Sequence, residues 1–303
     1  MPHGIRLFPA ATIATLAALS LAVPVATPAA AAVDVNAAPA SSGHGSDVEA
    51  NKAMVTNFYV RLFNEDDLSV IDANIGDVYI QHNPRLADGA EALRQFILAR
   101  PPRIPGSQNT IERVIGEGDL VLIHHHAVNV PGTPGTALMD VFRVSKGKIV
   151  EHWDVIQPVP AISANGNDMF ATLSPSGDRS TLRSKLIVLS YYAALTARHD
   201  LRAVDRFVSP SLIQHDPALP NGSAAVKAAF AARLQANPQL TFSSLQVIAD
   251  HDLVSLRYHV QNNPTDLGQA VNDTYRVRNG KIVEHWNVVQ NVPGTSANTN
   301  TMF

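Results

Sequence analysis

The chain has 303 residues, no cysteine and a formal net charge of −3 at pH 7. Disulfides, thiolate zinc sites and a catalytic cysteine are therefore excluded, and the basic excess typical of proteins that bind nucleic acid is missing. Hydrophobic residues make up 46% and charged residues 16% of the sequence, which is enough apolar side chain for a buried core and unlike a disordered chain. The length predicts one large domain or two of ordinary size.

The first 32 residues are typical of a secretory signal peptide. Arg6 precedes an apolar, alanine-rich stretch over 7–25, and three alanines at 30–32 offer a small-residue cleavage site. A membrane anchor is the alternative, but the stretch is short, contains prolines and is followed by no basic cluster. We therefore expect cleavage, a secreted or periplasmic protein without membrane attachment afterwards, and a flexible linker over 33–46.

The rest of the sequence consists of two similar units in tandem. The heptapeptide GKIVEHW at 147–153 returns intact at 280–286, and QHNP at 81–84 returns as QHDP at 214–217, each 133 positions later. A constant offset of this length indicates an ungapped duplication of a whole domain, since solenoid repeats are much shorter. The predicted units are a first domain over 47–170, a linker over 171–180 and a second domain over 181–303.

Within each copy, helices come first and strands follow. In the first copy, apolar positions at helical spacing predict a helix over 47–63. Shorter helices are expected over 68–75 and 89–99, with a short strand over 78–82 between them. Four strand-like runs separated by turns complete the unit, at about 109–115, 120–130, 136–145 and 148–157. This order predicts α+β domains, each with three helices packed on one face of a curved antiparallel sheet.

The turn at residues 146–147 sets the register of the last two strands if it is a two-residue hairpin. Asp140 would then lie opposite Trp153 and share its face of the sheet, and Asp273 would lie opposite Trp286. A slip of one residue would send the two partners to opposite faces.

These motifs resemble a known family. The order of elements is similar to the NTF2-like cone. The QHNP segment, the DVFR strand and GKIVEHWD resemble the SnoaL-like polyketide cyclases, and more narrowly the proteins described as predicted SnoaL-like aldol-condensation enzymes. The resemblance covers about 47–170 and 180–303. It implies two cones that pair through the outer faces of their sheets, as a pseudo-dimer inside one chain.

The resemblance also implies a site in each cone. In the family a strand aspartate is the acid/base, and a histidine of the neighbouring strand bonds to it. Asp140 with His126, and Asp273 with His259, match those positions. The substrate-binding wall is expected to contain His82, Trp153 and Tyr59 in the first copy, and His215, Trp286 and Tyr192 in the second. Because these residue types are the same in both copies, we expect two working pockets; a recent duplication would explain the identity equally well.

A carboxyl inside an apolar cone is harder to ionise, so its pKa should rise towards neutrality and allow proton transfer in both directions. This chemistry would support a cofactor-free aldol closure or cyclisation of a small apolar carbonyl or polyketide-like compound. Three alternatives stay open. A buried aspartate–histidine pair can be structural, the cone can belong to a non-catalytic small-molecule-binding protein, and it can serve protein interaction.

Three consecutive histidines, 124–126, raise the question of a metal, because alternate histidines on a strand can bind zinc. The second copy keeps only His259 of the three, and no HExxH motif is present, so we expect no metal. Both copies also end in NxNxMF, at 165–170 and 298–303. Apolar residues at a chain end predict that each tail folds back into an apolar groove.

Overall fold

The computed structural model describes residues 44–303. The expected signal peptide, 1–32, and almost all of the expected linker, 33–46, lie outside the described residues. Within the described part, no helix is long and apolar enough to cross a membrane.

The first copy follows the predicted order of elements, with boundaries that differ by a few residues. Its sheet has the strand order β1-β5-β4-β3-β2, and β1 runs parallel to β5, so the sheet is mixed rather than purely antiparallel. The elements are α1 (His44–Asn64), α2 (Ser69–Asn74), β1 (Ile75–Gln81), α3 (Ala90–Leu98), β2 (Gln108–Glu117), β3 (Leu120–Val128), β4 (Thr136–Ser145) and β5 (Lys148–Pro158).

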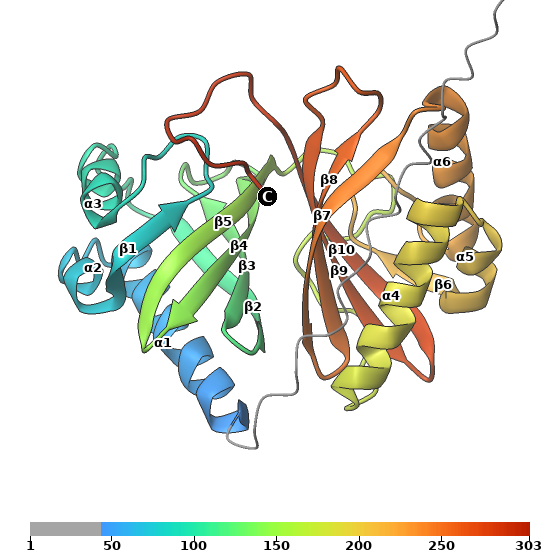
Figure 1. Ribbon diagram of the computed structural model, residues 1–303, viewed down its shortest axis with the longest axis horizontal. Coiled ribbons are helices and arrows are strands. Elements are labelled where there is room, and N and C mark those ends of the chain that lie inside the picture. Colours follow the sequence, from blue (N-terminus) through green and yellow to red (C-terminus); the bar gives the residue numbers. More distant parts are fainter. Residues whose placement is uncertain (1–43) are drawn as a thin grey trace, which may run out of the picture. The chain divides into compact units, whose positions relative to one another are not determined.

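The second copy repeats this topology, with the strand order β6-β10-β9-β8-β7 and β6 parallel to β10. Figure 1 shows the two α+β units, each with its helices on one side of its sheet. The elements are α4 (Thr181–Arg198), α5 (Arg202–Phe207), β6 (Val208–Gln214), α6 (Ser223–Ala236), β7 (Thr241–Asp250), β8 (Leu253–Gln261), β9 (Gln269–Arg278) and β10 (Lys281–Asn291).

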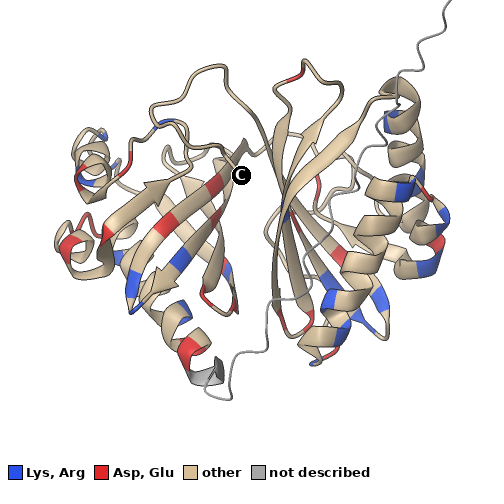
Figure 2. Ribbon diagram, viewed as in Figure 1, with Lys and Arg blue, Asp and Glu red and all other residues tan. Residues whose placement is uncertain are grey.

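Each sheet therefore has an inner face, which its own helices cover, and an outer face. On the inner face of the first copy, α1 buries Val55, Phe58, Tyr59 and Leu62 at helical spacing against the strands. Charged residues of both signs are interspersed over the helices, strands and loops of the described chain (Figure 2). The apolar face of α1 and the strands opposite it thus define the space in which the candidate site lies.

The outer faces of the two sheets pack against each other within one compact unit, as predicted. Trp286, Val155 and Met139 belong to one buried apolar cluster that both sheets share. Two ion pairs flank the sheets at positions 133 residues apart, and each joins an N-terminal helix to the other copy. Lys52 lies 2.8 Å from Asp250, and Lys185 lies 2.7 Å from Glu117. This reciprocity is what a pseudo-twofold axis inside the chain requires.

The β4–β5 hairpin contains a β-bulge that its turn does not reveal. Ser145 pairs with Lys148 as predicted, but the register then shifts by one residue, so that Arg143 pairs with Glu151. Asp140 consequently lies opposite Asp154. The predicted pairing of Asp140 with Trp153 was wrong, and the pairing of Asp273 with Trp286 was wrong for the same reason, because β10 carries the equivalent shift.

Candidate functional site

A cavity of about 480 Å³ lies between the helices and the inner face of the first sheet. Its wall is largely aromatic and aliphatic, and four polar side chains of β3, β4 and β5 enter it together. The apolar part includes Phe58, Leu93, Phe96, Leu138, Phe142 and Ile156, and the polar group is His125, Asp140, His152 and Asp154. Tyr59 also lines this cavity, where the sequence placed it.

Asp140 lies at the centre of the polar group, buried between two imidazoles. Its Oδ2 is 2.5 Å from His125 Nε2, and its Oδ1 is 2.9 Å from His152 Nε2. Burial alone would raise the pKa of Asp140, but the charge and hydrogen bonds of the two histidines lower it to about 2. The raised pKa expected for this carboxyl was therefore wrong, since the expectation counted burial and not the two partners.

The two histidines also contact polar side chains other than Asp140. The hydroxyl of Tyr59 lies 2.9 Å from His125 Nε2, and Asn109 Oδ1 lies 2.9 Å from His125 Nδ1. On the other side, Gln81 Oε1 lies 2.8 Å from His152 Nδ1. His152 is thus placed between the Gln81 amide and the Asp140 carboxylate. The imidazole geometry is thus fixed by partners on β1, β2 and α1.

Asp154 is the second carboxyl of the cavity and the one that sequence analysis missed. Its Oδ2 accepts a hydrogen bond from Asn83 Nδ2 over 2.5 Å, and its Oδ1 is buried without a partner among the described residues. Burial raises the pKa of Asp154 to about 6; His152 opposes this shift, and Asp140 adds to it. The signal that could have found it is a difference between the copies, because the second copy has Asn287 at this position.

His126 faces away from the cavity. Ile123 pairs with Asp140, so the side chains of β3 that share its face are those of Ile123 and His125. His126 instead lies on the outer face, where it stacks on Phe170 with ring centroids 4.0 Å apart. The predicted contact between His126 and Asp140 was wrong, because strand alternation brings the preceding histidine to the carboxyl.

The same holds for His259 in the second copy. It stacks on Phe303 with ring centroids 4.1 Å apart, and its Nε2 donates to the carbonyl of Leu267 over 2.8 Å. Asp273 lies opposite the strand partner Leu256, so the predicted contact of His259 with Asp273 was also wrong.

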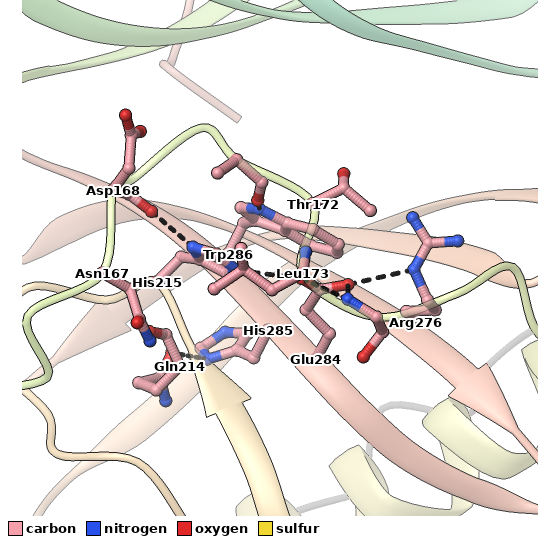
Figure 3. A network of polar contacts seen from close by, with 12 residues as sticks. Asn167, Asp168, Thr172, Leu173, Gln214, His215, Arg276, Glu284, His285 and Trp286 are labelled. Carbon is pink, nitrogen blue, oxygen red and sulfur yellow. Dashed lines mark hydrogen bonds and ion pairs between the residues drawn. The ribbon is translucent and has the colours of Figure 1, made fainter.

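The two tryptophans, and the histidines that directly follow β1 and β6, also lie on the outer faces. His82 stacks on Trp153 at 4.7 Å, and His215 stacks on Trp286 at 5.1 Å. In Figure 3 the residues after the first copy run across Trp286, whose Nε1 donates to the Ala171 carbonyl over 3.0 Å. The expectation that these four residues wall the pockets was wrong, since the bulge turns each tryptophan to the face opposite the aspartate.

Both predicted tails are buried in this outer-face region. Met169, Phe170 and Met302 are almost fully buried, and Phe303 is partly buried. The carbonyl of Phe170 accepts a hydrogen bond from Arg113, and that of Met302 accepts one from Arg257 over 3.0 Å. The tails therefore fill the space between the two sheets rather than lying free.

Comparison with known proteins gives the family. A family model for the SnoaL-like domain matches residues 55–152 and again residues 188–285. The chain belongs to the SnoaL-like family. No curated protein matches it.

Solved structures match one copy at a time. AclR from Streptomyces galilaeus, provisionally named a hydroxylase, is 25% identical; the match covers 37% of this chain and 91% of AclR, with a TM-score of 0.33. IdmH from Streptomyces antibioticus, provisionally named a polyketide cyclase, is 19% identical over 35% of this chain and 91% of its own, with a TM-score of 0.31. A SnoaL-like protein from Agrobacterium tumefaciens, provisionally named an isomerase, is 16% identical over 36% and 98%, with a TM-score of 0.32.

The second SnoaL-like copy keeps the aspartate but surrounds it differently. Asp273 accepts hydrogen bonds from Tyr258 at 2.6 Å, Tyr275 at 2.9 Å, His285 at 3.0 Å and Asn287 at 3.0 Å. Both of its oxygens are therefore fully bonded, and these bonds, against the effect of burial, keep its pKa lowered. The two copies therefore differ in the groups that surround this aspartate.

Tyr192 packs near this cluster, partly buried, with its ring centroid 5.2 Å from that of Tyr258. Among the replacements between the copies, three lie around this aspartate: His125 becomes Tyr258, Phe142 becomes Tyr275 and Asp154 becomes Asn287. Together they exchange titrating or apolar groups for donors that satisfy the aspartate.

Asp140, His152 and Asp154 each offer one possible ligand atom within 4.8 Å of the others. Proximity alone does not make this a metal site. We therefore assign no metal to this cluster.

Proposed function

We propose that the first SnoaL-like copy is a cofactor-free acid/base enzyme of the aldol-condensation or cyclase type. One observation carries this proposal: two carboxyls on adjacent strands share one cavity, and their surroundings push their pKa values in opposite directions. That of Asp140 is about 2 and that of Asp154 is about 6. Such separation is typical of sites in which one carboxyl transfers protons and the other keeps a fixed charge.

The proton-transferring group in this proposal is Asp154. Asp154 lines the cavity, and its buried Oδ1 has no hydrogen-bond partner among the described residues, so it keeps a free lone pair for a substrate proton. Ionised Asp154 takes a proton from the carbon next to a carbonyl, and the enolate that forms attacks a second carbonyl of the same molecule. The new carbon–carbon bond leaves an alkoxide, which takes the proton back from Asp154. No oxidant, reductant or cofactor enters this balance.

Asp140 acts in this proposal as a fixed anion that orients the two imidazoles. His152, held between Gln81 and Asp140, lowers the pKa of Asp154 and so favours its ionised form. The aromatic and aliphatic wall suits a small apolar carbonyl compound as the substrate.

Deuterium exchange tests the first step of this chemistry without knowledge of the natural substrate. With β-tetralone as the probe in D₂O, we expect the protein to speed deuterium incorporation next to the carbonyl. The rate should rise with pH through about 6, as Asp154 ionises. Asp154→Asn should lower it by roughly 10²–10⁴-fold, the usual contribution of a general base.

The matched control is Asn287→Ala, at the same strand position of the second copy, which should leave the exchange rate unchanged. Equal loss in both variants would contradict the assignment to Asp154. Binding of the probe without exchange would favour a non-catalytic binding protein.

We also propose that the protein is exported. The support is the sequence of residues 1–32, with its single arginine, apolar stretch and alanine-rich end. N-terminal sequencing of the mature protein is the direct check, with Val33 as the expected first residue.

A further inference from the structure

The last residues of the chain lie on the other copy. After β10 the segment 297–301, here called the C-terminal segment, runs along the loop between β1 and α3, as the dark red trace in Figure 1 shows. The Ala297 N–H donates to the Pro84 carbonyl over 2.8 Å. His82 Nδ1 donates to the Thr301 carbonyl over 2.5 Å. The C-terminal segment is thus bonded to the first copy at both of its ends.

Two asparagines between these ends hold the backbone of the same loop. Asn298 Nδ2 donates to the carbonyls of Asn83, at 2.8 Å, and of Leu86, at 2.7 Å. Asn300 Nδ2 donates to the Gln81 carbonyl over 3.0 Å and to an aspartate carboxylate of the loop over 2.8 Å. Asn298 therefore joins two points of the loop, and Asn300 joins the loop to the last residue of β1.

The side chains of the restrained residues support the cavity. Gln81 Oε1 is hydrogen-bonded to His152 Nδ1, and Asn83 Nδ2 donates to Asp154. The main-chain carbonyls of Gln81 and Asn83 thus bond to the second copy, while their side chains bond to the polar group of the first. A shift of this loop would move both supports together.

We propose that the C-terminal segment of the second copy positions the acid/base site of the first copy, with Asn298 and Asn300 as positioning residues. The inference rests on the proposed function, because it assigns the second copy the task of holding the site that the first one uses. It also gives a reason for the fused pair: a copy with Asn287 in place of the carboxyl still completes the site of its neighbour.

The chain contains its own control for this idea. The tail of the first copy makes the same contacts with the second, where Asn165 Nδ2 donates to the Asp216 carbonyl over 2.6 Å and Asn167 Nδ2 donates to the Gln214 carbonyl over 2.9 Å. In that loop Asp216 stands in place of Asn83, and Asn287 occupies the strand position of Asp154. Removing either pair of asparagines therefore removes the same kind of hydrogen bond. Only the removal of Asn298 and Asn300 affects the loop that contains Asn83, the hydrogen-bond partner of Asp154.

The experiment compares Asn298→Ala/Asn300→Ala with Asn165→Ala/Asn167→Ala in the full chain. The readout is the carbon-13 NMR titration of the Asp154 carboxyl, identified as the resonance that Asp154→Asn removes. Asn83 lowers the pKa of Asp154 by donating to its ionised form, so loosening the loop should raise that pKa by roughly half a unit or more. The other charged groups that act on Asp154 are the same in both variants: Asp140, His152 and Arg257.

An upward shift confined to the Asn298/Asn300 variant is the expected result, with a lower Tm in both variants. An equal shift in both, or none in a folded Asn298/Asn300 variant, would overturn the proposal. Asn300→Ala alone serves the same test if the double variant does not fold. The titration needs no substrate, so failure of β-tetralone exchange would count against the proposed function and not against this positioning role.

Discussion

Asp154→Asn is expected to stabilise the protein at pH 7 by roughly 2–3 kcal/mol while it removes the proton-transferring group. The pKa of Asp154 is raised from 3.8 to about 6 in the folded chain, and each unit corresponds to about 1.4 kcal/mol. The native state therefore holds the proton of this carboxyl more tightly than the unfolded state does. Its ionised form is the destabilising one, and asparagine cannot ionise.

The direction of the pKa shift of Asp154 determines the pH range over which its ionisation changes the stability. Because the folded pKa is the higher one, stability contributed by this group is present below about 3.8 and is lost as the pH rises to about 6. Urea unfolding at several pH values should therefore show a gain for Asp154→Asn that is small near pH 4 and largest above pH 6. Asn287, which already occupies this position in the second copy, shows that the fold accepts the amide.

The control for this measurement is Asp119→Asn, which changes a half-exposed carboxylate that pairs with Arg143. A surface change of this kind usually alters stability by less than about 0.5 kcal/mol. A gain for Asp154→Asn that is the same at pH 4 and pH 7 would contradict the role given to ionisation. A loss at pH 7 would contradict the destabilising character of the carboxyl altogether.

The fold was predictable because the sequence patterns that specify it occur in both copies. Helical spacing from Val55 to Leu62, strand-like runs and the turn at 146–147 all concern neighbours along the chain. They do not depend on which face of a sheet a residue occupies. Element order and the pairing of the two sheets therefore followed from the sequence and the family resemblance.

The candidate site was less predictable because its composition depends on which face of the sheet each side chain occupies. One bulged residue in GKIVEHW reverses the face of everything after it in β5, and this heptapeptide is identical in both copies. The repeat therefore could not disclose the error. The three consecutive histidines place side chains on both faces of β3, so the sequence alone did not show which of them lies near Asp140. The pairing of Ile123 with Asp140 decides that it is His125. The loss of Asp154 in the second copy was the one visible clue.

The largest loss of stability is expected for Asp140→Ala, about 3–5 kcal/mol at pH 7. The substitution leaves His125 Nε2 and His152 Nε2 buried without their acceptor, and removing one partner of a buried ionic group has a cost of this size. Asp140→Asn should lose less, because its amide oxygen can still accept from one imidazole. Urea unfolding of the full chain at pH 7 measures both variants.

The pH dependence of this loss should run opposite to that of Asp154. The pKa of Asp140 is lowered from 3.8 to about 2, so its contribution is present above 3.8 and is lost as the pH falls towards 2. The difference between wild type and Asp140→Ala should therefore shrink by about 2–3 kcal/mol between pH 5 and pH 2. Asp72→Ala, at a largely exposed carboxylate paired with Arg94, is the control and should change stability by less than about 1 kcal/mol. A loss for Asp140→Ala no larger than that control would mean that the carboxylate does not hold the two imidazoles in place.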